Sequence, residues 1–86
     1  MNIRFLPSFQ RSLKKLTPEQ KQNVSMSIKL FAEHSFDPKL RNYKLHGQYE
    51  GMRSITAGYD LRILYREEDG HVLIFFIDVG SRDEVY

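Results

Sequence analysis

Three strand-like segments near the C-terminal end of the chain constrain its fold more than any other feature. They are Met52–Ala57, Tyr59–Arg66 and His71–Val79, and all three are largely apolar. Gly58 is typical of a tight connection between the first two, and Asp69-Gly70 is a hairpin signal before the third. His71–Val79 is apolar on both faces, which predicts a central strand that is covered on both sides. The pattern predicts consecutive antiparallel strands.

Two amphipathic helices are predicted before this block. The first spans Ser8–Leu16, after Pro7 ends a short strand at Asn2–Leu6. The second begins after Thr17, an N-cap residue that can form a capping box with Gln20, and is expected to fray near residues 34–35. Apolar residues recur at helical spacing and are expected to face the core: Phe9, Leu13 and Leu16 in the first helix, and Val24, Met26, Ile28, Leu30 and Phe31 in the second.

The order of these elements predicts the fold class. A strand, two helices and then several strands indicate an α+β domain, with two N-terminal helices packed on a mainly antiparallel four- to five-stranded sheet. Asn42–Leu45 is a further short strand in this prediction, followed by a loop at His46–Gly51. The length of 86 residues fits a single domain, residues 1–86.

Composition excludes several classes of protein. The chain has no Cys, which excludes disulfides, a thiol nucleophile and Cys-based zinc sites. Its three histidines lack metal-ligand spacing, and no phosphate-binding glycine loop occurs, so we expect no metal and no small-molecule cofactor. The longest apolar run, residues 72–77, is too short to cross a membrane, and the N-terminus lacks a signal-peptide pattern. We therefore expect a cytoplasmic protein without a membrane partner.

Charge is unevenly distributed along the chain. Residues 1–53 hold ten Lys or Arg and four Asp or Glu, a net charge of +6. Residues 54–86 hold three Lys or Arg and seven Asp or Glu, a net charge of −4. A basic first half fits contact with a polyanion such as a nucleic acid, although a solvated basic face would show the same pattern.

Arg62 is the most informative cation because it lies within a hydrophobic strand, where arginine is rarely found without a partner. One expectation is an ion pair with a carboxylate such as Asp60 or Asp78. The other is that the guanidinium binds phosphate through its fork of donors.

Three separated motifs resemble those of the RelE/ParE toxin superfamily, and of its RelE/YafQ-type branch in particular. Residues 45–54 read Leu-His-Gly-x-Tyr-x-Gly-x-Arg-Ser, and residues 57–65 read Ala-Gly-Tyr-Asp-Leu-Arg-Ile-Leu-Tyr. Residues 76–86 read Phe-Ile-Asp-Val-Gly-Ser-Arg-Asp-Glu-Val-Tyr. The motifs occur in the order of the family, and the resemblance covers the whole chain.

The resemblance implies a RelE-like fold and the toxin of a type II toxin–antitoxin module, neutralised by a cognate antitoxin. It implies an mRNA endonuclease (mRNA interferase) that inhibits translation by cleaving mRNA in the A site of the 70S ribosome, in contact with 16S rRNA. The family uses no metal, since the ribose 2′-OH attacks the adjacent phosphate. Such a reaction needs a base, an acid, cations for the phosphorane and an aromatic face for the displaced base.

The same resemblance assigns catalytic roles. Arg62 matches a strand arginine expected at the transition-state phosphate, and Arg82 matches the basic residue after the final Val-Gly, where many relatives carry His. Arg82 stays protonated, so it cannot act as a base. Tyr86 matches the terminal aromatic residue, which stacks on the mRNA base or else packs on the core. Lys44 and His46 match basic positions before the glycine loop, and His46 is the residue suited to titrate near neutrality.

The expected RNA-binding cations lie elsewhere on the chain, and a surface salt bridge is the alternative for Arg53. They are Arg53, Arg11, Lys14, Lys15 and Lys21. Two other functions stay open. A ParE-like relative would inhibit DNA gyrase without cleaving RNA, and a catalytically inactive relative would only bind its antitoxin. The full set of RelE lysines is not evident, and Gly58-Tyr59-Asp60 replaces the Asp-Trp segment of YafQ, which fits a weakened or differently arranged nuclease.

Overall fold

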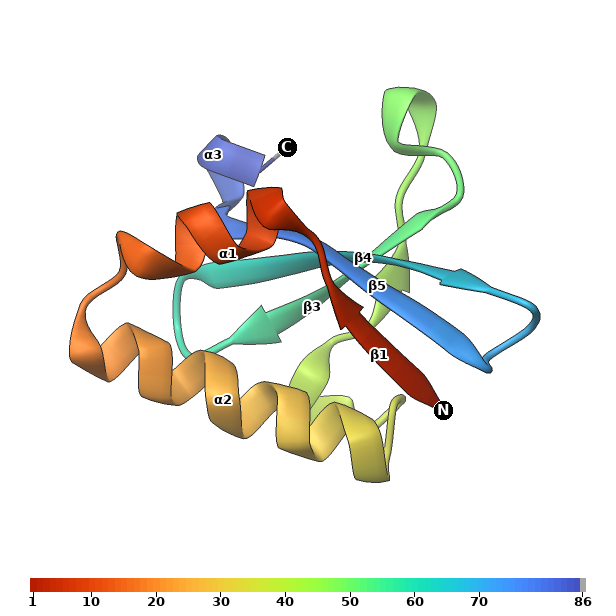
Figure 1. The fold of residues 1–86 in the computed structure, drawn as a ribbon, viewed down its shortest axis with the longest axis horizontal. Coiled ribbons are helices and arrows are strands. Elements are labelled where there is room, and N and C mark those ends of the chain that lie inside the picture. The colour runs from red at the N-terminus through yellow and green to blue at the C-terminus, as the bar shows by residue number, and fades with distance from the viewer. Residues whose placement is uncertain (86) are drawn as a thin grey trace.

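Five strands form one sheet in the order β1-β5-β4-β3-β2, and the helices are packed around it (Figure 1). The computed structural model describes residues 1–85. The strands are β1 (Asn2–Phe5), β2 (Tyr43–Lys44), β3 (Met52–Ala57), β4 (Leu61–Glu68) and β5 (Leu73–Ser81). The helices are α1 (Pro7–Lys14), α2 (Pro18–Glu33) and α3 (Arg82–Val85), with 3-10 turns η1 (Pro38–Leu40) and η2 (Gly47–Tyr49).

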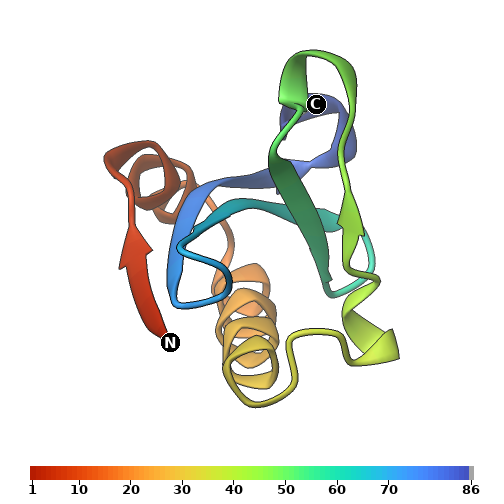
Figure 2. The same cartoon turned by 90° about the vertical axis from the view of Figure 1, so that its right-hand side faces the viewer.

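The sheet confirms the predicted α+β class. Strands β2 to β5 pair antiparallel in sequence order, and only β1 is parallel, alongside β5. Figure 2 shows β1 at one margin of the sheet, and the connection between β2 and β3 projecting away from α2. Within the described residues no helix is long and apolar enough to cross a membrane.

The predicted coverage of the last strand on both faces is wrong. The strand begins at Leu73, two residues later than predicted, because the turn that begins at Asp69 continues through Val72. Its burial alternates: Ile74 and Phe76 are fully buried, whereas Phe75 on the other face is only partly covered. The Arg66 guanidinium lies 4.9 Å from the centre of the Phe75 ring. An arginine can cover an aromatic residue in this way without a second layer of helices.

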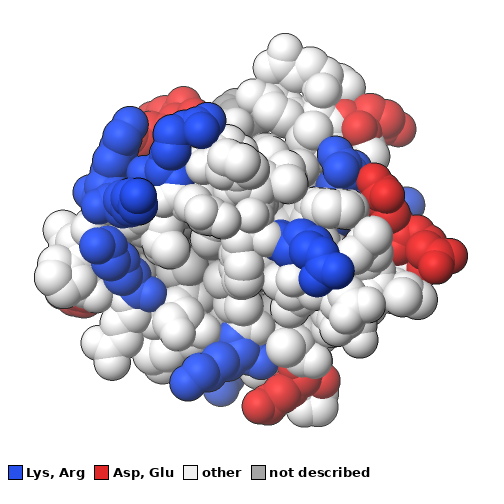
Figure 3. Space-filling model, in the orientation of Figure 1, with Lys and Arg blue, Asp and Glu red and all other residues white. Residues whose placement is uncertain are grey.

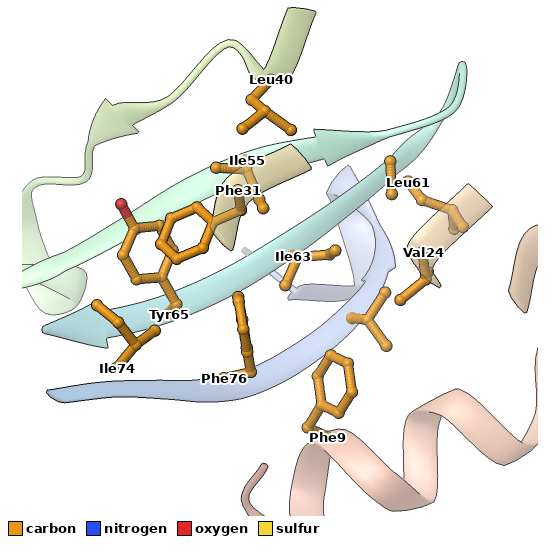
Figure 4. Close-up of a cluster of buried hydrophobic side chains, with 12 residues drawn as sticks. Phe9, Val24, Phe31, Leu40, Ile55, Leu61, Ile63, Tyr65, Ile74 and Phe76 are labelled. Atoms are coloured by element: carbon orange, nitrogen blue, oxygen red, sulfur yellow. The ribbon is translucent and has the colours of Figure 1, made fainter. Parts of the chain in front are cut away.

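Helices α1 and α2 cover the same face of the sheet and enclose the core (Figure 4). The centres of the Phe9 and Phe76 rings are 5.9 Å apart, and those of Phe31 and Tyr65 are 4.9 Å apart. Phe31 and Phe9 are almost fully buried, as their helical spacing predicted. Met26 is 61% exposed, so the predicted apolar stripe of α2 is narrower than expected.

The helix starts follow the predicted chemistry. At α2 the Thr17 hydroxyl accepts the Gln20 N–H at 3.1 Å, and the Gln20 side chain accepts the Thr17 N–H at 3.0 Å, which confirms the capping box. Pro7 begins α1 and does not merely end the preceding strand. Helix α1 stops at Lys14, two residues before the predicted end.

Helix α1 also covers the edge of β5 beyond the point where β1 ends. The Ser8 hydroxyl donates to the Ile77 carbonyl, and the Ser12 hydroxyl lies 2.5 Å from the Asp78 carboxylate. The Val79 N–H donates to the same Asp78 oxygen at 2.8 Å. Because serine side chains occupy polar groups at this edge, β5 is closed there without another strand.

Candidate functional site

Arg62 lies on the sheet face opposite α1 and α2, and it is half-buried. Its Nη1 donates to the Thr56 hydroxyl at 2.8 Å and to the Leu61 carbonyl at 3.1 Å. Within residues 1–85 it forms no ion pair with a carboxylate, and Asp78 is engaged by Ser12 and Val79 instead. The expected ion pair with Asp60 or Asp78 is therefore wrong, and the guanidinium keeps donors for an anion.

Arg82 comes to the same end of the sheet. Arg62 is directly opposite Gly80 in the β4–β5 pair, and Arg82 begins α3 two residues later. A Cβ atom on Gly80 would lie 3.2–3.3 Å from Glu84 and Val85, so glycine allows α3 to pack closely on the strand. The strand register thus brings Arg62 and the start of α3 to the same end of the sheet. Tyr86, for which a catalytic role was predicted, lies outside the described residues.

The Glu84 carboxylate fixes the start of α3. The Ser81 N–H donates to its Oε1 at 2.8 Å, and this hydrogen bond holds the pKa of Glu84 below its usual value, with a smaller contribution from nearby Lys15. An acidic residue in the first turn also suits the helix dipole. Arg82 therefore lies in a turn that the hydrogen bond between Ser81 and Glu84 holds in place.

Lys44 and His46 lie at the other end of β3. Lys44 is opposite Arg53 in the β2–β3 pair, whereas Arg62 is opposite Thr56 in the β3–β4 pair. Arg53 and Thr56 are three residues apart on β3, which is roughly 10 Å along the strand. The His46 side chain is 84% exposed, and its Nδ1 lies 3.9 Å from the Glu50 carboxylate. The strand register does not bring these predicted catalytic residues beside Arg62.

Arg53 is on the face of the sheet that carries the helices, because it is opposite Tyr65. Its Nε donates to the Asn42 side chain at 2.8 Å, and its guanidinium lies 5.1 Å from the centre of the Phe36 ring. Asn42 in turn donates to the Tyr65 hydroxyl at 2.7 Å. Burial raises the pKa of Tyr65, against the opposing effects of Asn42 and Arg53. These contacts give Arg53 a structural role at the edge of the core.

Ser35, His71 and Glu67 form a hydrogen-bonded series in the order of a hydrolase triad. The Ser35 hydroxyl is 2.8 Å from His71 Nε2, and Nδ1 is 2.5 Å from the Glu67 carboxylate. The hydroxyl donates its only proton to the Phe31 carbonyl at 2.9 Å, so His71 must be the donor to Ser35. The serine is not arranged as a nucleophile. The three residues instead connect the end of α2 to the β4–β5 turn through hydrogen bonds.

The cations predicted on the helices are all exposed. Figure 3 shows basic side chains gathered over α1 and its connection to α2. They form a basic surface that is suited to contact with phosphates. Its members among the predicted residues are Arg11, Lys14, Lys15 and Lys21.

The structure adds a cationic pocket that the sequence analysis missed. It has a volume of about 250 Å³ and lies between η1 and the turn that joins β3 to β4. Within residues 1–85, no carboxylate is among its lining residues. Two of its cations lie more than twenty residues before Arg62 in the chain, so only tertiary structure brings them together. The lining residues are Lys39, Arg41, Thr56, Gly58, Tyr59 and Arg62.

Several solved structures from toxin–antitoxin systems have the same architecture. YafQ from E. coli strain BL21(DE3) is 15% identical and has a TM-score of 0.83, with 99% of this chain and 97% of that chain covered. The YoeB/ParE toxin from Agrobacterium tumefaciens is 14% identical, with a TM-score of 0.78 and coverages of 95% and 99%. A chain of the toxin–antitoxin complex RelBE2 from Mycobacterium tuberculosis is 28% identical, with a TM-score of 0.65 and coverages of 94% and 96%.

This chain therefore has the fold of YafQ and of the YoeB/ParE toxin. A family model for the ParE toxin of the type II toxin–antitoxin system parDE matches residues 3–86, and the chain belongs to this family. A comparison with curated proteins found no match.

Proposed function

We propose that this protein is a ribosome-dependent mRNA endonuclease, the toxin of a type II module, acting in the cytoplasm. The observation that supports this most is Arg62, a half-buried arginine whose hydrogen bonds within residues 1–85 go to a hydroxyl and a carbonyl, not to a carboxylate. Such a guanidinium is positioned by neutral groups and keeps its charge for phosphate. The similarity in fold to YafQ agrees with this proposal.

The proposed reaction is transesterification without a metal. A base removes the proton of the 2′-OH, the 2′ oxygen forms a bond to phosphorus, and the bond to the 5′ oxygen breaks as that oxygen gains a proton. Arg62 and Arg82 stabilise the charge of the phosphorane. His46 is the residue proposed to exchange protons, with Lys44 beside it, and Tyr86 is proposed to stack on the base. Since His46 lies on an exposed loop, ribosome binding would have to bring it to the RNA.

The test is primer extension on mRNA incubated with purified 70S ribosomes. Cleavage within the A-site codon should require ribosomes and should be lost in an Arg62→Ala/Arg82→Ala variant. Arg66→Ala is a matched control, because Arg66 lies on the same face of β4 but is paired with Glu68 at 3.1 Å. That variant should cleave like the wild type. An absence of cleavage by the wild type would overturn the proposal.

A cognate antitoxin is the proposed protein partner. The toxin–antitoxin complexes among the similar structures, DinJ–YafQ and RelBE2, motivate this proposal. An acidic protein would complement the exposed cations Arg11, Lys14, Lys15 and Lys21. Co-expression with the product of a neighbouring short reading frame should restore growth and yield a stable complex.

Inhibition of DNA gyrase is the second candidate, favoured by the match to the ParE toxin family. Under this function, gyrase-trapped DNA breaks should accumulate on expression, and RNA cleavage should not occur. A catalytically inactive, antitoxin-binding relative would give neither result, and its expression would leave growth unchanged. The two assays therefore separate all three functions.

A further inference from the structure

We infer that the pocket between η1 and the β3–β4 turn is a second RNA subsite, which holds one nucleotide next to the phosphate at Arg62. In this inference Lys39 and Arg41 bind its phosphate, and Tyr59 stacks on its base. The inference rests on the proposed function, because it takes single-stranded RNA as the ligand. It adds three residues that neither the family match nor the sequence motifs assign to binding.

The charge of the pocket fits a phosphodiester. Lys39, Arg41 and Arg62 all line it, and no carboxylate of the described residues does. Within residues 1–85 none of these three cations forms an ion pair. The two nearest acidic residues in sequence, Asp37 and Asp60, are not among the lining residues of this pocket. Asp37 accepts the Lys39 N–H at 2.9 Å as the cap of η1, and Asp60 lines a different cavity together with Asp78.

The two added cations stand on a fixed backbone. Leu40, between them in sequence, is only 1% exposed and belongs to the core. The Arg41 N–H donates to the Pro38 carbonyl at 3.2 Å, and Arg41 takes a left-handed conformation with φ 49° and ψ 50°. Such a conformation is uncommon for a residue other than glycine. The side chains of Lys39 and Arg41 are therefore exposed on a turn that the core holds in place.

The aromatic residue of the pocket is displayed on an equally fixed turn. Tyr59 is 98% exposed, whereas six of the ten Phe and Tyr residues within residues 1–85 are buried or half-buried. Gly58 before it has φ +71°, and a Cβ there would lie 2.6 Å from the Asn23 side chain of α2. The turn thus packs closely on α2. An exposed ring on a rigid turn beside cations is the arrangement that binds single-stranded nucleic acid by stacking.

The pocket and the reaction site are continuous through Arg62. The Thr56 hydroxyl that orients Arg62 is also part of the pocket lining. A strand of RNA with its scissile phosphate at Arg62 would therefore pass its neighbouring nucleotide across the β3–β4 turn. An acidic protein segment is the competing occupant, since it would also meet three cations.

The test uses the absence of tryptophan from the chain. A Tyr59→Trp variant carries a single fluorescent reporter in the pocket. We titrate it with a 2′-O-methyl hexanucleotide, which the proposed reaction cannot cleave, and with an abasic oligomer of the same length. Stacking predicts strong quenching by the hexanucleotide and at least fivefold less by the abasic oligomer. Val72→Trp, on the exposed turn before β5, is the matched control and should not be quenched.

A second arm tests the cations. Adding Lys39→Gln and Arg41→Gln to the Tyr59→Trp variant should raise the Kd for the hexanucleotide at least tenfold, with an unchanged melting temperature. Equal quenching of the two tryptophan variants, or quenching at Tyr59→Trp by hexaglutamate but not by RNA, would overturn the inference. Because the RNA is not cleaved, the result is independent of catalysis. Ribosomal cleavage without quenching would refute only the subsite, and quenching without cleavage would refute only the proposed reaction.

Discussion

Thr56 and Arg62 face each other across the β3–β4 pair, and the arginine donates to the threonine hydroxyl at 2.8 Å. The hydroxyl fixes a guanidinium that would otherwise sample several rotamers on an open sheet face. We therefore expect a Thr56→Val variant to lose about tenfold in cleavage rate, while its stability stays within about 1 kcal/mol, because the shape of the side chain is nearly kept. Primer extension and urea unfolding measure the two quantities.

Thr56→Ser is the control for that experiment, since it keeps the hydroxyl and should keep most of the activity. Equal activity of the serine and valine variants would show that the hydrogen bond does not position Arg62.

Gly58→Ala is expected to destabilise the protein more than Gly70→Ala. Both glycines have positive φ, +71° and +69°, so each substitution brings the left-handed penalty of about 1 kcal/mol. Only at Gly58 would the new Cβ also meet a neighbour, Asn23, at 2.6 Å. We expect a total loss of about 2–3 kcal/mol at Gly58. Urea unfolding of both variants measures the difference, and equal losses would contradict the close packing of this turn.

Tyr65 makes stability depend on alkaline pH. Burial raises the pKa of its hydroxyl above the ordinary value in the folded state, so the fold favours the neutral form. The contribution of the neutral Tyr65 hydroxyl to the free energy of unfolding is complete below the unfolded-state pKa. It is lost as pH rises through the higher folded-state pKa. The unfolding free energy should therefore fall above about pH 10, and less steeply in Tyr65→Phe than in the wild type.

Tyr59→Phe is the matched control for the pH experiment, because it removes a hydroxyl from a fully exposed side chain. Urea unfolding between pH 8 and pH 11 compares the three proteins. Parallel pH profiles for wild type and Tyr65→Phe would contradict the assignment to Tyr65.

The basic surface on α1 should govern the salt dependence of ribosome binding. Removing one cation that binds a phosphate should reduce the slope of log K against log salt by about one. An Arg11→Gln/Lys14→Gln/Lys15→Gln variant is therefore expected to bind 70S ribosomes with a shallower slope. Lys29→Gln, an exposed change on α2, is the control. An unchanged slope in the triple variant would show that α1 does not bind the ribosome.

Local patterns predicted much of the fold because the relevant interactions are close in sequence. The capping box at Thr17 and the helical spacing that buries Phe9 and Phe31 involve neighbours within one or two turns. Strand β3 has the predicted bounds, Met52–Ala57, because glycines flank it. The coverage of β5 was misjudged because the sequence does not reveal that the Arg66 side chain lies over Phe75 on the face without helices α1 and α2.

The candidate site was likewise predicted in part from the sequence and in part decided by the tertiary structure. The sequence marked Arg62 as unusual, because an arginine between apolar strand residues needs a reason to be there. Which group it contacts depended on strand register: pairing with Thr56 gave it a hydroxyl, and Asp78 was already bound to α1. The same packing placed Lys39 and Arg41 beside Tyr59 and separated Lys44 from Arg62. Composition and periodicity set the types and faces of the elements, whereas long-range pairing sets which side chains meet, since that depends on contacts between distant parts of the chain.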